Sequence, residues 1–280
     1  MPLTVYVSGR FVSLDEASVP LTDRGLLFGD GIYEVYRVYR GRPFRLKEHF
    51  ERLRRSATEI RLALPETDWI ALHAELAERN GLRDADWTVY VQVTRGAPAS
   101  RGHAFPAVET PPTLFVIARP FTEPAATLHD DGASVITRAD IRWGRCNVKS
   151  VNLLPNVLAS QEAAEAGAWE AVFVRDSVVT EGAHTNVFAV LDGRVTTHPE
   201  GPRILSGVTR AAVLELAHAE GLPVDETPMR LEALTGATEV FLTGTTAEVM
   251  PVVHVDGRPV GTGRPGPVAK RLRAAFRRLV

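Results

Sequence analysis

Hairpin signals interrupt the alternation of strands and helices along the chain, and they constrain the fold more than any other feature. Residues 1–17 and 31–46 each contain two alternating apolar runs around a short turn. Asp192-Gly193 marks a third hairpin within residues 185–198. Hairpins join antiparallel strands, whereas a doubly wound parallel sheet needs a crossover between successive strands. The pattern therefore favours an α+β fold over a single parallel sheet.

A short stretch with two prolines, RPFTEPAA at residues 119–126, fits a linker between two domains. We expect an N-terminal α+β domain over residues 1–118 and a C-terminal α+β domain over residues 127–280. Thr67 is a candidate N-cap for a helix that ends at Gly81. A helix that ends at Gly167 is expected to bury one apolar face, formed by Leu154, Val157, Leu158 and Ala164.

Composition limits the classes of function. The chain has 280 residues, 45% of them hydrophobic and 24% charged, and a net charge of −2. A charge this close to zero gives no electrostatic reason to expect a nucleic-acid or membrane partner. Cys146 is the one cysteine, and the eight histidines form no HExxH pair or other ligand cluster, so we expect no disulfide framework and no metal site. Without a signal-peptide core or a membrane-length apolar run, we expect a cytoplasmic protein.

Lysine is rare in this chain, and its use at position 149 raises the question of a chemical role. Of the 32 basic residues only three are lysines: Lys47, Lys149 and Lys270. A lysine amine can lose its proton and attack a carbonyl to form a Schiff base, which a guanidinium cannot do. Most lysines are solvated surface residues, so Lys149 alone is only a candidate nucleophile.

A carboxylate in VVTEGAHTNVFAV becomes relevant beside such a lysine. Glu181 lies at the end of an expected strand, where a simple turn would also explain it. In pyridoxal chemistry, a carboxylate paired with the ring nitrogen keeps that nitrogen protonated, and the ring then withdraws electrons best. Glu181 is therefore a candidate for this partner.

Three further stretches offer anion-binding groups. ILSGVTRAAVLELA and FLTGTTAEV place glycine and hydroxyl residues before a helix or turn, where free backbone amides bind phosphate. VTRGAPASRGHAFP places Arg101 and His103 two residues apart, and an arginine fork suits a carboxylate. Helix capping and a polar loop explain these stretches equally well when each is taken alone. The dinucleotide GxGxxG fingerprint and the GxSxG elbow are absent.

Taken together, these motifs resemble one family almost from end to end. The chain is similar to the fold-type IV pyridoxal-phosphate enzymes, and among them to the D-amino-acid aminotransferases. The matching stretches are DRGLLFGDGIYEVYRVYRG, EHFERL, VQVTRG, DIRWGRCNVKSVNLL, VTEGAHTNVF, ILSGVTR and TTAEVMPV. The resemblance implies a two-domain α+β fold with pyridoxal 5'-phosphate between the domains, a homodimer, and transamination of D-alanine or D-glutamate with 2-oxoglutarate or pyruvate.

The resemblance also assigns site residues. Lys149 would form the Schiff base with the cofactor, and Glu181 would pair with its pyridine nitrogen. The phosphate would be bound by Arg52, Val208, Thr209 and Thr245. The α-carboxylate of the substrate would be held by Tyr33, Arg101 and His103, of which the last two are characteristic of the D-amino-acid enzymes.

The chain departs from the family pattern at three places. The loop from Gly96 to Arg101 is one residue longer, Gly244 stands where serine is common, and residues 183–185 replace a more serine-rich run. Three alternatives stay open: 4-amino-4-deoxychorismate lyase, an R-selective amine or branched-chain aminotransferase on the same fold, and a binding protein without catalysis. Arg101 and His103 argue against the second, and the Lys149 and Glu181 pair argues against the third.

Overall fold

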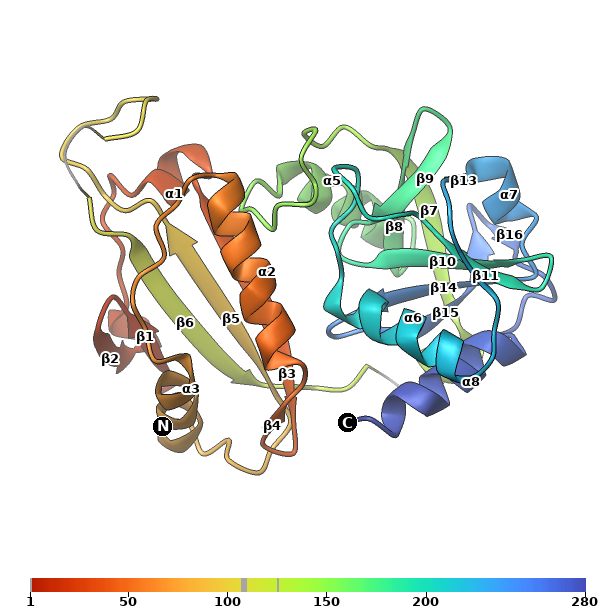
Figure 1. The fold of residues 1–280 in the computed structure, drawn as a ribbon, viewed down its shortest axis with the longest axis horizontal. Helices are drawn as coiled ribbons and strands as arrows, with labels where there is room; N and C mark the ends of the chain where they lie inside the picture. The colour runs from red at the N-terminus through yellow and green to blue at the C-terminus, as the bar shows by residue number, and fades with distance from the viewer. Residues whose placement is uncertain (1, 107–109, 125) are drawn as a thin grey trace. The chain divides into compact units, whose positions relative to one another are not determined.

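The computed structural model describes residues 2–106, 110–124 and 126–280, with the side chain of Ala126 left out. Its contacts divide the chain into two compact units. The first unit contains residues 1–122 and Val148–Asn152, and the second contains Glu123–Asn147 and Leu153–Val280. Figure 1 shows a separate sheet and a separate set of helices in each unit.

The first unit is built on one antiparallel sheet of six strands in the order β2-β1-β6-β5-β3-β4. The strands are β1 (Thr4–Val7), β2 (Arg10–Ser13), β3 (Gly31–Tyr39), β4 (Arg42–Pro43), β5 (Trp87–Thr94) and β6 (Thr113–Pro120). The first two expected hairpins, β1–β2 and β3–β4, are confirmed. Its helices are η1 (Leu14–Glu16), α1 (Arg24–Phe28), α2 (Leu46–Glu59) and α3 (Trp69–Arg79).

Helix α2 covers the sheet of the first unit (Figure 1) because its apolar residues recur at helical spacing. Phe50, Leu53 and Ala57 are buried in the same core as Trp87 and Ile32. The N-cap of α3 is Asp68, whose side chain accepts hydrogen bonds from two backbone amides, and not Thr67 as expected.

The second unit is built on a mixed sheet. Nine strands follow the order β12-β11-β10-β14-β15-β7-β8-β9-β13, and β16 pairs with β15. The strands are β7 (Ala133–Ala139), β8 (Glu170–Arg175), β9 (Val178–Gly182), β10 (Asn186–Leu191), β11 (Arg194–Thr197), β12 (Val224–Glu226), β13 (Met229–Arg230), β14 (Glu239–Gly244), β15 (Glu248–Val255) and β16 (Arg258–Pro259). Three pairs are parallel, β11–β12, β15–β7 and β7–β8, and the others are antiparallel. The α+β class is confirmed, as is the hairpin at Asp192-Gly193.

The described residues of the second unit form five helices: α4 (Ala126–Asp131), α5 (Leu154–Glu165), α6 (Val208–Ala219), α7 (Leu231–Thr235) and α8 (Pro267–Arg277). The predicted buried face of α5 is wrong. Leu154 is 69% exposed, Val157 59% and Leu158 50%, and the helix buries Ala159 and Ala163 instead. The small alanines allow α5 to pack closely on β7 and β8, and the larger apolar residues are left on the outside.

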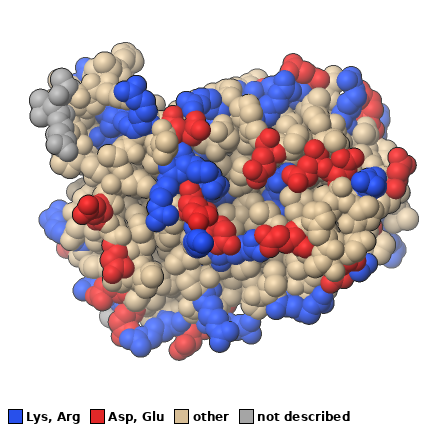
Figure 2. All heavy atoms as spheres, viewed as in Figure 1, with Lys and Arg blue, Asp and Glu red and all other residues tan. Residues whose placement is uncertain are grey.

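The unit boundary after Thr122 lies inside the expected linker, of which Ala125 is outside the described residues. The segment Val148–Asn152 was expected in the second domain, but its contacts are with the first unit. The proposed division into domains of residues 1–118 and 127–280 stays a prediction. Among the described residues, no helix is both long and apolar enough to cross a membrane. On the face drawn in Figure 2, lysine and arginine are interspersed with aspartate and glutamate.

Candidate active site

Lys149 lies in a short segment that extends the pairing of β3. The amide of Tyr33 donates to the Lys149 carbonyl at 2.9 Å, and the Val151 amide donates to the Gly31 carbonyl at 3.1 Å. The Lys149 amide donates to Ser56 Oγ on α2 at 3.1 Å. Lys149 is half-buried, and its Nζ lies 4.3 Å from the centroid of the Tyr33 ring. The backbone on both sides of the lysine is thus fixed, and its amine is placed over an aromatic face.

Arg52 lies on the buried face of α2 in a cluster with two other polar residues. Its Nε donates to Glu34 Oε1 at 2.7 Å, and its Nη2 donates to Glu34 Oε2 at 2.8 Å. His49 Nδ1 is 2.9 Å from Glu34 Oε2. Glu34 is fully buried, which raises its pKa, but the two-pronged pair with Arg52 and the contact with His49 lower the pKa to about 2. Burial lowers the pKa of His49 more than Glu34 raises it, so its imidazole is neutral at pH 7.

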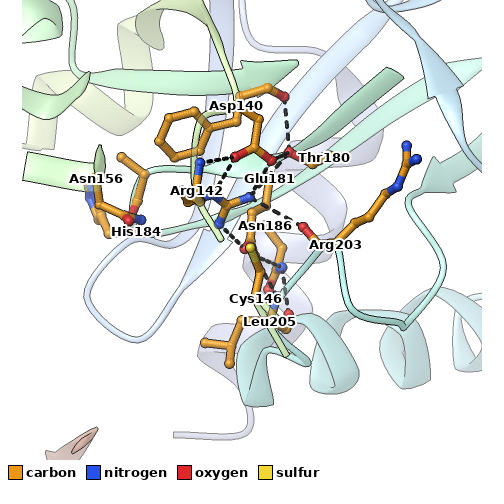
Figure 3. A network of polar contacts seen from close by, with 12 residues as sticks. Asp140, Arg142, Cys146, Asn156, Thr180, Glu181, His184, Asn186, Arg203 and Leu205 are labelled. Atoms are coloured by element: carbon orange, nitrogen blue, oxygen red, sulfur yellow. Dashed lines mark hydrogen bonds and ion pairs between the residues drawn. The ribbon is translucent and has the colours of Figure 1, made fainter. Parts of the chain in front are cut away.

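Glu181 is buried at the end of β9 and is held from three sides (Figure 3). Arg142 Nη1 donates to Oε1 at 2.5 Å. The Asn186 side-chain amide and the Leu205 backbone amide donate to Oε2 at 3.1 and 2.9 Å. These contacts fix the orientation of the carboxylate and leave Oε1 with one hydrogen bond among those described, so that oxygen can accept another.

Arg142 divides its charge between two buried carboxylates. Its Nε and Nη2 donate to the two oxygens of Asp140 at 2.9 and 3.0 Å, and its Nη1 donates the hydrogen bond to Glu181. Burial raises the pKa of Glu181 above its ordinary value, Arg142 lowers it, and the negative charge of Asp140 raises it again. The net direction is upward, because Arg142 compensates Glu181 only in part.

The N-terminus of α6 carries Val208 and Thr209, both buried. Its N-cap is Gly207, and no side chain caps the helix. A Cβ at Gly207 would lie 2.0 Å from Asn186 Oδ1, so only glycine allows Asn186 to approach this closely. Asn186 therefore touches both Glu181 and the start of α6. Uncapped amides at the start of a 12-residue helix suit an anion such as a phosphate group.

Thr245 lies in the turn between β14 and β15, where Gly244 precedes it. A Cβ at Gly244 would lie 3.4 Å from Thr185 Cγ2 and 3.5 Å from the His184 carbonyl oxygen, which are ordinary contacts. The serine common at this position would therefore fit, and glycine is not required by packing.

Arg101 and His103 are exposed on the loop after β5, and both lie against the ring of Phe28 at the end of α1. The Arg101 guanidinium is 4.6 Å from the ring centroid, and the His103 ring is 5.2 Å from it. Tyr33 has other neighbours, Lys149 and Tyr90, whose ring stacks on it at 5.5 Å. The structure thus brings Arg101 and His103 together, and it brings Tyr33 to Lys149.

The run of residues 183–185 that departs from the family pattern surrounds another buried carboxylate. Glu170 Oε2 is 2.8 Å from His184 Nδ1 and accepts hydrogen bonds from the His184 amide and from Thr185 Oγ1 at 3.3 and 3.1 Å. Asn156 on α5 donates to the Ala183 carbonyl at 2.7 Å. These bonds hold the chain between Glu181 and Asn186, so the replacement residues support the turn next to the carboxylate.

Sequence reasoning missed Glu34 and Arg142, which hold Arg52 and Glu181 in place. Both lie inside motifs that the sequence singled out, next to Tyr33 and seven residues before Lys149. A charged residue within a strand of apolar residues was the available signal for Glu34, since burial of such a residue requires a partner.

Comparison with known proteins identifies the family. The profile of Amino-transferase class IV matches residues 31–255. The D-alanine aminotransferase of Staphylococcus haemolyticus is 42% identical over 278 residues, which cover 99% of this chain and 97% of that protein. The D-alanine aminotransferase of Bacillus licheniformis is also 42% identical, over 98% of this chain and 96% of that protein.

Solved structures agree with the sequence matches. A branched-chain amino acid aminotransferase of T.th., solved with pyridoxamine 5'-phosphate, superposes with a TM-score of 0.88 at 32% identity, over 99% of this chain and 93% of that one. The branched-chain amino acid aminotransferase of Escherichia coli superposes with a TM-score of 0.86 at 29% identity, over 100% of this chain and 94% of that one. The chain therefore belongs to the class IV aminotransferases, enzymes of the transaminase class.

Proposed function

We propose that this enzyme transfers the amino group of a D-amino acid, of the D-alanine and D-glutamate class, to a 2-oxo acid such as 2-oxoglutarate or pyruvate. The two D-alanine aminotransferases that match nearly the whole chain support this substrate class. The observation that carries the proposal is that Arg101 and His103 both lie against the ring of Phe28. Two cationic or donor groups at one place suit a carboxylate.

Each unit, taken by itself, contains residues that suit a part of pyridoxal 5'-phosphate. When bound, this cofactor supplies an aldehyde that reacts with amines and a ring that withdraws electrons from the substrate carbon. Glu181 Oε1 can accept the hydrogen of a protonated ring nitrogen, because it accepts one other hydrogen bond among those described. The uncapped start of α6 at Val208 and Thr209 would bind the phosphate, and Arg52 and Thr245 complete the proposed set.

Lys149 has the proposed catalytic role. Its Nζ would hold the cofactor covalently and would also serve as the base that takes the proton from the substrate Cα. The Tyr33 ring lies 4.3 Å from Nζ, and the backbone amide of Lys149 is bound to Ser56, so we propose that this amine approaches the substrate from one side. Handedness then depends on which side of the substrate carbon carries the carboxylate, and we propose that Tyr33, Arg101 and His103 bind it.

A second candidate is a branched-chain L-amino acid aminotransferase, because the solved structure that matches with a TM-score of 0.88 has branched-chain activity in its name. A panel of D- and L-amino acids with 2-oxoglutarate, analysed for chiral products, separates the two. We expect D-alanine and D-glutamate to react at least about 100-fold faster than L-valine or L-leucine, on the scale of discrimination that a charged contact provides. A preference for the L-amino acids would overturn the proposal in favour of the second candidate.

Borohydride reduction of the holoenzyme followed by peptide mapping tests Lys149 directly. The pyridoxyl label is expected on Lys149, whereas Lys47 is 84% exposed and paired with Glu51. A Lys149→Ala variant should lose the covalent chromophore and nearly all turnover. A label on Lys47 or Lys270, or normal turnover in the variant, would contradict the assignment.

We also propose that the protein is a cytoplasmic homodimer. The apolar side chains that α5 exposes, Leu154, Val157 and Leu158, support an interface with a second copy. Light scattering after gel filtration should give twice the chain mass of 30.6 kDa. A Leu158→Glu variant should shift the mass towards that of one chain, and a wild-type protein that elutes as a monomer would contradict the proposal.

A further inference from the structure

Arg24 lies beneath the loop that carries Arg101 and His103. It is the first residue of α1 and is only 4% exposed. Its Nη1 donates to the carbonyls of Gly102 and Ala104 at 2.6 and 3.2 Å, and its Nη2 donates to the carbonyl of His103 at 3.1 Å. One buried guanidinium thus binds three consecutive carbonyl oxygens of the loop.

This contact determines the path of the loop. In an extended chain successive residues face opposite sides, so three consecutive carbonyls can meet one guanidinium only where the chain bends around it. Residues 103 and 104 form such a bend. Next to this bend, the side chains of Arg101 and His103 lie against the Phe28 ring, which also lies 4.9 Å from the Arg24 guanidinium.

Arg24 is itself held by a chain of ion pairs. Its Nε donates to Asp30 Oδ2 at 2.7 Å, and Arg95 donates to both oxygens of Asp30 at 2.8 and 3.0 Å. Arg95 also donates to the Ile60 and Arg61 carbonyls, and its guanidinium lies 3.7 Å from the centroid of the Phe105 ring. The forked guanidinium of Arg24 therefore has a fixed position and orientation relative to the sheet of the first unit.

The start of the loop is fixed by the same helix. The backbone amide of Arg24 donates to the Gly96 carbonyl at 2.9 Å. Gly96 has φ of +85°, and a Cβ there would lie 2.0 Å from the Pro111 carbonyl oxygen, so the position requires glycine. The loop is thus bound at Gly96 and again at Gly102, and the additional residue relative to the family pattern falls between these two points.

We infer that Arg24 is a positioning residue for the substrate carboxylate: its fork fixes residues 102–104 and so sets where Arg101 and His103 point, whatever the length of the loop before them. This inference rests on the proposed function, in which Arg101 and His103 bind the carboxylate. Lysine can replace Arg24 only in part, because its single nitrogen cannot reach Asp30 and three carbonyls in a fixed geometry.

The test compares four variants of the holoenzyme: Arg24→Gln, Arg24→Lys, Arg101→Gln and Arg37→Gln. Arg37 is the matched control, since it is also a buried arginine of the first unit paired with an aspartate, Asp86. Steady-state kinetics with D-alanine gives KM and kcat, and limited trypsin digestion gives the rate of cleavage after Arg101. The cleavage rate reports on the loop without any turnover.

For Arg24→Gln we expect KM for D-alanine to rise about tenfold or more, with kcat changed less than threefold, since a fixed carboxylate contact contributes mainly to binding. Cleavage after Arg101 should accelerate by a similar factor, and Arg24→Lys should fall between this variant and wild type. Arg37→Gln should lower stability and leave KM and the cleavage rate unchanged. Arg24 variants with wild-type KM and cleavage rate, or an Arg37 variant with the same changes, would overturn the inference.

Arg101→Gln separates this inference from the proposed function. A raised KM in Arg101→Gln with a normal KM in both Arg24 variants refutes the positioning role alone. An unchanged KM in Arg101→Gln would show that Arg101 does not bind the substrate carboxylate. The proposed effect of Arg24 on substrate binding would then be refuted as well. A variant that lacks Ala99, which lies between Gly96 and Gly102, tests whether the length of the loop matters. Its KM for D-alanine should stay within threefold of wild type. A tenfold rise would show that Arg24 does not keep residues 102–104 in place when the loop before them is shortened.

Discussion

Two buried carboxylates, Glu34 in the first unit and Glu181 in the second, are each paired with one arginine, yet their pKa values move in opposite directions. Glu34 receives two hydrogen bonds from Arg52 and is in contact with His49, and its pKa falls to about 2. Glu181 receives one hydrogen bond from Arg142, which gives two others to Asp140, and its pKa rises.

The difference lies in how the arginine is shared. Arg52 and His49 together outweigh the burial of Glu34, and the two hydrogen bonds from Arg52 to Glu34 hold Arg52 in place. Arg142 is divided between two carboxylates, so the charge of Glu181 is compensated only in part and is stabilised further by any additional cation. A protonated pyridine nitrogen is such a cation, which is why Glu181 suits the proposed role and Glu34 does not.

The largest expected effect separates the two residues by activity. Glu181→Gln should reduce the turnover of D-alanine by about 10²-fold or more, the scale for loss of a preorganised electrostatic contact, because a neutral amide cannot stabilise a protonated ring nitrogen. Steady-state kinetics and the absorbance of the bound cofactor measure this. A variant with turnover within threefold of wild type would remove Glu181 from the proposed role.

Glu34→Gln should act on stability. Removal of one partner of a buried ion pair leaves Arg52 uncompensated, so the free energy of unfolding should fall by about 3–5 kcal/mol. Urea unfolding of the cofactor-stripped protein measures it. Glu170→Gln is a control, because Glu170 is equally buried but is in contact with the half-exposed His184. The free energy of unfolding should fall less in this variant than in Glu34→Gln. Equal losses in the two variants would show that Arg52 is not the main partner.

Glu34 and Glu181 should contribute opposite slopes to the change of the free energy of unfolding with pH. Glu34 has a lowered pKa in the folded state, so its contribution is complete above the ordinary glutamate value of 4.5 and is lost as pH falls towards 2. Glu181 has a raised pKa, so the folded state binds more protons and stability falls as pH rises above 4.5. Urea unfolding of the stripped protein between pH 3 and 7 should show each slope disappear in its own Gln variant. A slope that both variants retain would contradict the difference between them.

The smallest expected effect concerns His49. Because burial keeps this imidazole neutral at pH 7, it contributes a hydrogen bond to Glu34 and no charge. His49→Gln retains a donor, so the free energy of unfolding should change by about 1 kcal/mol. A loss as large as that of Glu34→Gln would mean that His49 carries a charge and stabilises the Glu34 carboxylate as strongly as Arg52 does.

Sequence reasoning can select candidate residues where the chemistry of a short motif demands one residue type. Lys149 and Glu181 were identified as candidates because a Schiff base requires an amine and a ring nitrogen requires a carboxylate, and their cofactor roles stay predictions. The hairpins were predicted because each turn and its two strands are close in sequence.

It failed where the partner of a residue is distant in sequence or where packing decides. Arg24 and Gly102 are 78 positions apart, and no local pattern joins them. The apolar face of α5 was assigned by residue type, but the helix packs through Ala159 and Ala163 because small side chains permit a closer approach to the sheet. The spacing of apolar residues along a helix predicts an apolar face, but it does not predict which other element packs against that face.

The membership of Val148–Asn152 in the first unit has a consequence for protein engineering. The residues before and after this segment belong to the second unit, so neither compact body corresponds to one uninterrupted piece of the gene. A fragment that stops at Thr122 lacks Val148, which belongs to the same core as Ile32, and it lacks the segment that hydrogen-bonds to residues 31–33. Independent production of that body would therefore require grafting the five-residue peptide back, for instance through a designed connection after residue 122.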